Sequence, residues 1–292
     1  MLQSSTGFEP AFSSTLDRVG RDGALALAFQ RRGEKTVLTE RRFTLPLQAL
    51  EPISLAPDGS VCLMLLNPTG GVLGGDQLKT EVTLGPGAHV CLTTPSATRV
   101  YRALGPPAVQ ETTIRLGAGA IVEYLPDHLI PHPGSALHQS LTVEMGPGSR
   151  AIVSDAMAIG RLAREERWVF RELTSRIAVT SSGRLLFLDR ISLDPSRRIP
   201  EGLGGMERFG YLASIALFAD DFAGWEDMMA ALEARLAGWP SVRGGVSPMA
   251  RGGCLVRFLA PSACDLTEAS RGLWTLSRQL LLGLAPLDLR KG

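Results

Sequence analysis

The sequence has almost no excess of charge of either sign. Thirty Lys and Arg residues stand against 29 Asp and Glu residues, which leaves a formal net charge of +1 at pH 7. A chain with this balance has no overall field that would attract nucleic acid or an anionic membrane. We therefore expect no nucleic acid and no membrane among its partners, which must be recognised locally.

Long apolar runs and targeting signals are missing as well. The most apolar late stretch, WTLSRQLLLGLAPL, contains Arg278 and is shorter than the roughly 20 residues that a membrane-spanning helix needs. The first residues, MLQSSTGFEPAF, lack the basic start, apolar middle and small-residue cleavage site of a signal peptide. These absences predict a cytoplasmic protein.

Cysteine is scarce, and its spacing shows no zinc site. The four cysteines are Cys62, Cys91, Cys254 and Cys264, and no two of them form a C-x-x-C pair. Three of the four lie among apolar neighbours, where cysteine usually behaves as a small hydrophobic residue. We expect reduced thiols in the core, and a soft-metal site remains the alternative.

Signatures of catalysis and of nucleotide binding are absent too. No G-x-S-x-G nucleophile elbow occurs, and the four histidines have no recognisable nucleophile partner. The stretch NPTGGVLGGD, residues 67–76, lacks the G-K-[ST] ending and the G-x-G-x-x-G order of nucleotide-binding loops, and a strand pattern follows it. We interpret it as a tight turn in which backbones approach closely. Its Asp76 either caps loop amides or faces a metal, and capping is favoured.

What the sequence does contain is a repeat marked by glycine. Three segments share an apolar alternating run, a G-x-G turn and a second run: VTLGPGAHVCL, IRLGAGAIVEYL and LTVEMGPGSRAIV. Glycine supplies the positive φ that tight hairpin turns need. With two looser copies, the repeat recurs about every 30 residues, which is the period of a solenoid, a β-helix or a long sandwich, and we favour the stacked form. The turn glycines are Gly59, Gly87, Gly119, Gly148 and Gly183.

The pattern changes near residue 205. Helical spacing of apolar residues begins at Trp225 and ends at Gly238 and Pro240. The stretch GVSPMARGGCLVRFL is typical of a hairpin, and a second helix follows in which Asp265 and Glu268 resemble a capping box. The last third is therefore expected to mix helix and strand.

Together these patterns predict a mainly β fold. We expect stacked, two-layer, β-helix or solenoid-like sheets with a few C-terminal α-helices. Stacked strands should run from about Ile53 to Asp194. The chain should form a single domain over residues 1–292, with a β-layer body over 24–200 and a mixed helix and hairpin part over 205–292.

Four strings in this sequence resemble the urease accessory protein D family (UreD). They are NPTGGVLGGDQL, LTTPSATRVYRA, IVEYLPDHLIPHPGSA and AIGRLAREERW, and the similarity runs from about Ala24 to the end of the chain. The resemblance implies a β-rich, two-layered scaffold rather than an enzyme. It also implies three partners: an accessory protein F, an accessory GTPase G and nickel-free urease, to whose active site nickel passes.

The resemblance also marks individual residues. In the motif loop these are Gly70, Gly71, Gly74, Gly75 and Asp76. In AIGRLAREERW they are Gly160, Arg161 and Glu166, but not Glu165, where many members of the family have glycine.

Carboxylates and imidazoles are the candidate nickel contacts, since both are reasonable nickel ligands. Pro131 and Pro133 forbid a helix, so the nearby histidines need not converge, and a solvated loop is the favoured alternative. We expect weak, transient contacts and no tightly bound cofactor, because a transferring protein must release its ion. The candidates are Asp76, Glu123, Asp127, His128, His132 and Glu144.

Other acidic and histidine residues are assigned no function. Glu123, Glu144 and Asp155 lie on strands, where acidic residues mostly face solvent unless a water-filled passage threads the layers. We interpret His89 as a strand surface residue and His138 as a residue without a nearby partner.

The two expected C-terminal helices offer apolar faces for accessory protein F. Aromatic residues and methionine are favoured anchors at interfaces, although these faces could instead pack on the β layers. The four anchors proposed are Trp225, Met229, Trp274 and Leu280.

Two other functions stay open. A β-solenoid enzyme acting on carbohydrate through clustered carboxylates is one, and the aromatic content of 6% is low for sugar stacking. A generic protein-binding scaffold is the other.

Overall fold

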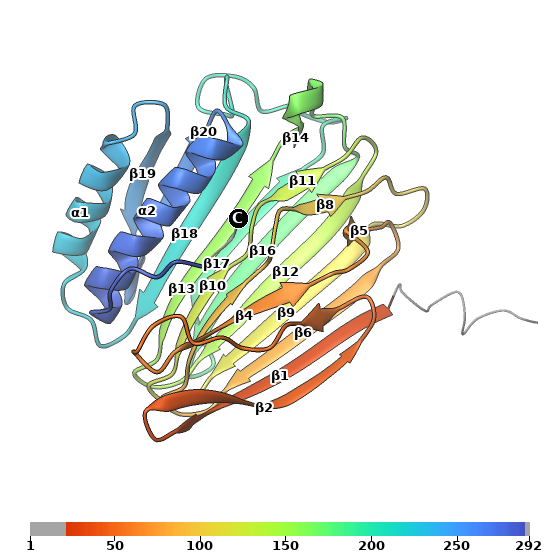
Figure 1. The fold of residues 1–292 in the computed structure, drawn as a ribbon. Helices are drawn as coiled ribbons and strands as arrows, with labels where there is room; N and C mark the ends of the chain where they lie inside the picture. The colour runs from red at the N-terminus through yellow and green to blue at the C-terminus, as the bar shows by residue number, and fades with distance from the viewer. Residues whose placement is uncertain (1–21, 290–292) are drawn as a thin grey trace, which may run out of the picture.

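The polypeptide winds into a β-solenoid of about four turns and ends in two helices (Figure 1). The computed structural model describes residues 22–289. The expected mainly β, solenoid-like fold with C-terminal helices is confirmed. Within residues 22–289, no helix is both long enough and apolar enough to cross a membrane.

The first sheet has seven strands in the order β17-β16-β12-β9-β6-β1-β2. The neighbours from β1 to β16 run parallel, whereas β2 and β17 are antiparallel edge strands. Its strands are β1 (Asp22–Arg32), β2 (Lys35–Thr44), β6 (Gln77–Leu84), β9 (Ala108–Leu116), β12 (Ala136–Met145), β16 (Glu172–Ser181) and β17 (Arg184–Leu193).

The second sheet has eleven strands, with the main order β19-β20-β18-β13-β10-β7-β4-β3, and the short strands β5, β8 and β11 lie beside this path. A separate pair joins β14 (Gly160–Arg161) to β15 (Glu166–Arg167). The eleven strands are β3 (Gln48–Ala49), β4 (Val61–Leu66), β5 (Gly71–Val72), β7 (His89–Thr93), β8 (Thr98–Val100), β10 (Ile121–Leu125), β11 (Leu129–Pro131), β13 (Arg150–Ala158), β18 (Tyr211–Ala219), β19 (Arg243–Pro248) and β20 (Gly253–Ala260).

The second glycine of each G-x-G repeat adopts the left-handed backbone conformation, with positive φ, that the turn requires. The φ angles of Gly87, Gly119 and Gly148 are 66°, 64° and 63°, a region that other residues enter only with strain. These three turns pass from the first sheet to the second, so they are corners of the solenoid and not the hairpins that we expected. The turn at Gly183 is a hairpin, because it joins β16 to its antiparallel neighbour β17.

The first glycine of each repeat is needed for space. A Cβ atom at Gly117 would lie 2.8 Å from the backbone nitrogen of Pro86 in the preceding corner. A Cβ atom at Gly146 would lie 2.6 Å from the backbone oxygen of Leu116. Successive corners can therefore stack on one another only if this position carries no side chain.

Apolar side chains fill most of the space between the two sheets. One buried cluster, which includes Phe29, Leu84, Val122 and Phe218, lies toward the G-x-G corners. A second cluster lies toward the opposite end, where β5, β8, β11 and β14 are found (Figure 1). A third lies between the second sheet and the helices.

The helices α1 (Trp225–Ala237) and α2 (Ala263–Leu282) cover the outer face of the second sheet beside β18 and β20 (Figure 1). The expected first helix and the expected hairpin, β19 with β20, are present. The cap of α2 differs from our expectation, because Ser262 and not Asp265 is the N-cap residue. Its Oγ accepts a hydrogen bond from the backbone N–H of Asp265 at 3.1 Å.

Candidate functional site

A belt of polar side chains crosses the interior between the two apolar clusters of the solenoid. In the first sheet, Gln139 pairs in register with Gln110 on one side and with Ser175 on the other. Thr80 and Thr112 form the next polar row. Because successive residues of a strand point to opposite faces, all five side chains belong to the inward face of this sheet.

Asp155 on β13 reaches this belt from the second sheet. Its Oδ1 accepts a hydrogen bond from Nε2 of Gln139 at 3.0 Å, and its Oδ2 accepts one from Oγ of Ser175 at 2.8 Å. Burial raises the pKa of Asp155 above its ordinary value, and the charge of Asp189 acts in the same direction against these hydrogen bonds. Asp189 on β17 forms an ion pair with Arg257 on β20, and this pair is a second polar contact between the two sheets.

The polar belt borders a cavity of about 150 Å³ between the layers. Its lining includes Thr80, Gln110, Gln139, Asp155 and Ser175. A polar space of this size can hold several water molecules. The remaining accessible surface of Asp155 therefore faces this cavity.

The cavity reaches the surface where three neighbouring strands of the second sheet are interrupted together. The chain leaves the ladder at residues 67–70, 94–97 and 126–128, and all three breaks contribute lining residues. Exposed residues within the second break, Pro95 and Ser96, belong to the lining. We call these three breaks the side opening.

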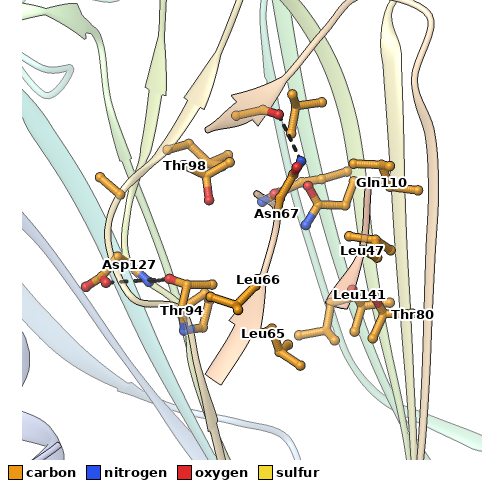
Figure 2. Close-up of a pocket in the computed structure, with 18 of the residues that line it drawn as sticks. Leu47, Leu65, Leu66, Asn67, Thr80, Thr94, Thr98, Gln110, Asp127 and Leu141 are labelled. Carbon is orange, nitrogen blue, oxygen red and sulfur yellow. Dashed lines mark hydrogen bonds between the residues drawn. The ribbon is translucent and has the colours of Figure 1, made fainter. Parts of the chain in front are cut away.

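Asp127 stands at the side opening. Figure 2 shows Asp127 and Thr94 on one wall and Thr80 and Gln110 on the facing wall. The backbone N–H of Asp127 donates to Oγ1 of Thr94 at 2.9 Å, which fixes the position of the loop. A carboxylate thus stands at the entrance and a second one, Asp155, stands inside.

The motif loop, residues 67–76, forms another part of this wall. Gly70 and Gly75 have φ angles of 79° and 88°. Gly71 and Gly74 provide space, because a Cβ atom at Gly71 would lie 2.4 Å from the backbone oxygen of Arg99 and one at Gly74 would lie 2.5 Å from Cβ of Ala103. The four glycines therefore produce a tight turn.

Asp76 closes this turn as a cap. Its Oδ2 accepts a hydrogen bond from the backbone N–H of Leu73 at 2.8 Å, and its own N–H donates to the Leu73 oxygen at 3.1 Å. The side chain is buried. The geometry thus shows the capping contact that the sequence favoured.

A second polar group lies on the outer face of the second sheet, beneath α2, and sequence reasoning missed it. Arg278 is fully buried and its two terminal nitrogens contact Glu123 and Asp58. Its Nε donates to the backbone oxygen of Ala285 at 2.9 Å, beyond the end of the helix. We call Arg278, Glu123, Asp58, His89 and Trp274 the helix latch.

Glu123 is the centre of the helix latch. Nε2 of His89 lies 2.8 Å from its Oε1, and Nε1 of Trp274 donates to its Oε2 at 2.7 Å. Burial opposes ionisation, but the His89 hydrogen bond, the charges of His89 and Arg278 and the Trp274 hydrogen bond together hold the pKa of Glu123 below its ordinary value.

The surface positions that we expected for His89 and Glu123 are therefore wrong, since both side chains are buried. The run HVCLT of β7 is buried at every position, so this strand is covered on both faces. A near-continuous apolar run is the sequence signal for such a strand, and it indicates that His89 is a core residue. His138 also has a partner, because its Nε2 lies 3.2 Å from Oε2 of Glu172.

Comparison with known proteins decides the family. A sequence profile described as UreD urease accessory protein matches residues 21–291. The chain belongs to the UreD family. A relative from Alkalilimnicola ehrlichii, named urease accessory protein UreD, is 36% identical over 287 residues, covering 97% of this chain and 94% of the relative.

Two further relatives with the same name agree with this assignment. The protein from Cupriavidus necator is 34% identical over 273 residues, covering 91% of this chain and 92% of the relative. The protein from Deinococcus radiodurans is 35% identical over 280 residues, covering 95% and 97%. The UreD family is thus one of accessory proteins rather than of enzymes.

The second UreD motif is a small, tightly constrained loop. A Cβ atom at Gly160 would lie 1.9 Å from the backbone oxygen of Glu166, so glycine is required there. Arg161 and Glu166 form a two-pronged ion pair, with Nη2 at 2.6 Å from Oε1 and Nε contacting Oε2. Glu165, between these two residues, adopts a φ of 60°.

The six candidate nickel contacts do not lie together. Among residues 22–289, no group of three or more His, Cys, Asp or Glu side chains is arranged to hold a metal ion. Asp76 caps the motif loop, Glu123 belongs to the helix latch and Asp127 lies at the side opening. The ring of His128 contacts Tyr211, and the ring of His132 contacts Tyr101. Glu144 lies beside Arg115 on the outer face of the first sheet.

The structure adds Asp155 to the residues around the cavity. We had expected it on a solvent face, but it lies in the interior belt. Strand alternation alone could not show that its side chain faces a cavity between the sheets rather than bulk solvent.

The four proposed anchors for a partner differ in exposure. Trp274 is buried and donates to Glu123, so it faces the core. Trp225 and Met229 are partly buried against the cluster beneath the helices. Leu280 is 40% exposed and is the member of this set most available to another protein.

Proposed function

We propose that this chain is a urease maturation factor. In this proposal it docks on nickel-free urease together with accessory proteins F and G and assists delivery of nickel to the urease active site. The names of the UreD relatives support the link to urease. The single observation that supports a direct part in nickel transfer is the polar cavity between the sheets, with carboxylates at its side opening and in its interior.

The chemistry of the lining suits an ion in transit. Carboxylate, amide and hydroxyl oxygens can replace part of the hydration shell of a divalent cation, but they hold it less firmly than a closed set of thiolates and imidazoles. Asp127 would meet the ion at the side opening and Asp155 would meet it inside. A cation beside Asp155 would also supply the counter-charge that burial otherwise makes costly.

The rival is a scaffold that only positions its partners while the GTPase delivers nickel directly. The two mechanisms differ in the effect of removing charge without changing shape. We expect Asp127→Asn and Asp155→Asn to leave the complex with F, G and urease assembled but to lower the nickel content of urease.

The experiment is coexpression with urease and its accessory proteins, followed by measurement of bound nickel per urease active site. Glu111→Gln is the matched control, because Glu111 is an exposed carboxylate on β9 that does not line the cavity. Equal nickel loading by wild type and by the double variant, in an intact complex, would leave only the scaffold. Absence of any effect of the wild-type chain on urease activation would contradict the maturation role itself.

A further inference from the structure

Three apolar side chains project from neighbouring loops at the end of the solenoid opposite the G-x-G corners. Leu73 is 47% exposed, Leu104 is 88% exposed and Val169 is 45% exposed. Large apolar side chains that gather on a surface commonly mark a contact with another protein.

Backbone contacts show that these loops lie side by side. The space above Gly74, next to Leu73, is occupied by Ala103, next to Leu104. The N–H of Ala103 donates to the oxygen of Gly134 at 3.0 Å, and the N–H of Gly134 donates to the oxygen of Val169 at 2.8 Å. The three side chains therefore belong to one surface, which we call the loop-end patch.

The loop-end patch is rigid. Leu73 lies close to Gly71 and Gly74, neither of which has room for a Cβ atom, and Asp76 binds both backbone groups of Leu73. Arg171 donates from Nη1 to the oxygen of Gly105 at 2.9 Å and holds the loop that carries Leu104. Anchors that are already ordered lose little entropy when a partner binds.

The rim of the patch is positively charged. Arg99, Arg102 and Arg164 are exposed, and none of them forms an ion pair with another residue between 22 and 289. Residues 95–107 contain two of these arginines and no acidic residue. His132 lies beside this rim, and its pKa is lowered. Burial is the largest cause, and the positive charges of Arg161, Arg99 and Arg164 act in the same direction, against the charge of Glu166.

We propose that the loop-end patch is the surface that docks on nickel-free urease, and that it binds a face of urease that presents apolar side chains edged by carboxylates. This inference rests on the maturation function proposed above. Urease is the chosen occupant because the loop that projects Leu73 also lines the cavity with Gly70, Gly71 and Val72. A protein seated on Leu73 therefore lies beside the side opening, where a receiver of nickel has to be.

The test measures binding of the complex between this chain and accessory protein F to nickel-free urease. Leu73→Ser with Leu104→Ser, and separately Arg99→Glu with Arg102→Glu, should each weaken this binding at least tenfold. Leu188→Ser and Arg184→Glu are matched controls, because both residues are exposed on β17, and they should change the affinity less than twofold. Added salt should weaken binding of wild type more than binding of the arginine variant.

Each result has a clear consequence. Unchanged urease affinity in both loop-end variants, with far-ultraviolet circular dichroism and melting temperature like wild type, overturns the inference. Loss of protein F instead of urease also overturns it, because the patch would then belong to another partner. If the wild-type complex itself does not bind urease, the maturation function fails and this inference fails with it.

Discussion

Glu165 illustrates how one residue can hold a backbone conformation that carries an energetic cost. It ends the short 3₁₀ turn Leu162–Arg164 with a φ of 60°, and its exposed side chain forms no ion pair within residues 22–289. A residue with a Cβ atom loses roughly 1–2 kcal/mol in this conformation. Glycine avoids this strain but costs about 0.5–1 kcal/mol in unfolded-state entropy.

We predict that Glu165→Gly stabilises the protein by about 0.5–1 kcal/mol, as the difference between these two effects. The melting temperature should rise by roughly 2 °C for a chain of this size. Glu165→Ala is the control, because alanine removes the side chain but keeps the strain. A glycine variant that melts no higher than the alanine variant would show that the backbone at this position is not strained.

At the same residue scale, the sequence predicted the positions that depend on local backbone shape. The turn glycines were recognised because positive φ and tight packing are local properties that recur with the repeat. The partners of His89 and Arg278 were not, because the contact between Arg278 and Glu123 spans 155 residues of chain. No spacing rule connects positions so far apart.

At the scale of elements, the helix latch decides how α2 sits on the second sheet. Its charges come from α2, from β10 and from the loop before β4, and Nη1 of Arg150 on β13 adds a hydrogen bond of 2.6 Å to the oxygen of Leu281. A buried ion pair adds little net stability, but removing one partner leaves a buried charge uncompensated. The latch therefore fixes the position of α2 more than it strengthens the fold.

We predict that Arg278→Met lowers the free energy of unfolding by roughly 3–5 kcal/mol, because Glu123 and Asp58 lose their buried counter-charge. Adding Glu123→Gln to this variant should cost less than the sum of the two single changes. Arg271→Met is the matched control on the same helix, since Arg271 is exposed and its pair with Asp288 is weak. Urea denaturation measures all five proteins, including wild type and the single Glu123→Gln variant, and additive effects would exclude coupling through the latch.

The pH dependence of the latch has a definite sign. The pKa of Glu123 lies below its ordinary value of 4.5 in the folded protein, so the unfolded chain binds its proton first as the pH falls. Its contribution is complete above that ordinary value and is lost as the pH falls through the folded pKa. The stability difference between wild type and Glu123→Gln should therefore shrink below about pH 4.5.

Element prediction succeeded where the periodicity was strong and failed where it was absent. The amphipathic pattern from Trp225 to Leu236 predicted α1 within one residue of its end. The run YLASIALFA, now β18, was not predicted, because a strand buried along most of its length has no polar face to produce alternation. The capping box was placed one turn late because Asp265 and Glu268 match the motif as well as Ser262 and Asp265 do.

At the scale of the whole molecule, the stacked corners and the cavity are two results of one architecture. Each solenoid turn places one strand in each sheet, so a polar inward residue in successive turns builds a continuous belt. Belts of this kind cost stability unless their members bond to one another or to water. The Gln139, Ser175 and Asp155 contacts meet part of this need, and the cavity leaves room for water.

The last prediction tests this space by filling it rather than by removing charge. Thr80 lines the cavity from β6, and Thr83 lies on the exposed face of the same strand. If nickel passes between the layers, Thr80→Phe should lower the nickel content of urease in an assembled complex, whereas Thr83→Phe should not. The inward phenylalanine should also cost about 1–3 kcal/mol by overpacking, so circular dichroism and complex assembly must be checked first. Normal nickel loading by a folded Thr80→Phe variant would mean that the ion does not need the cavity, even if the carboxylates at its opening matter.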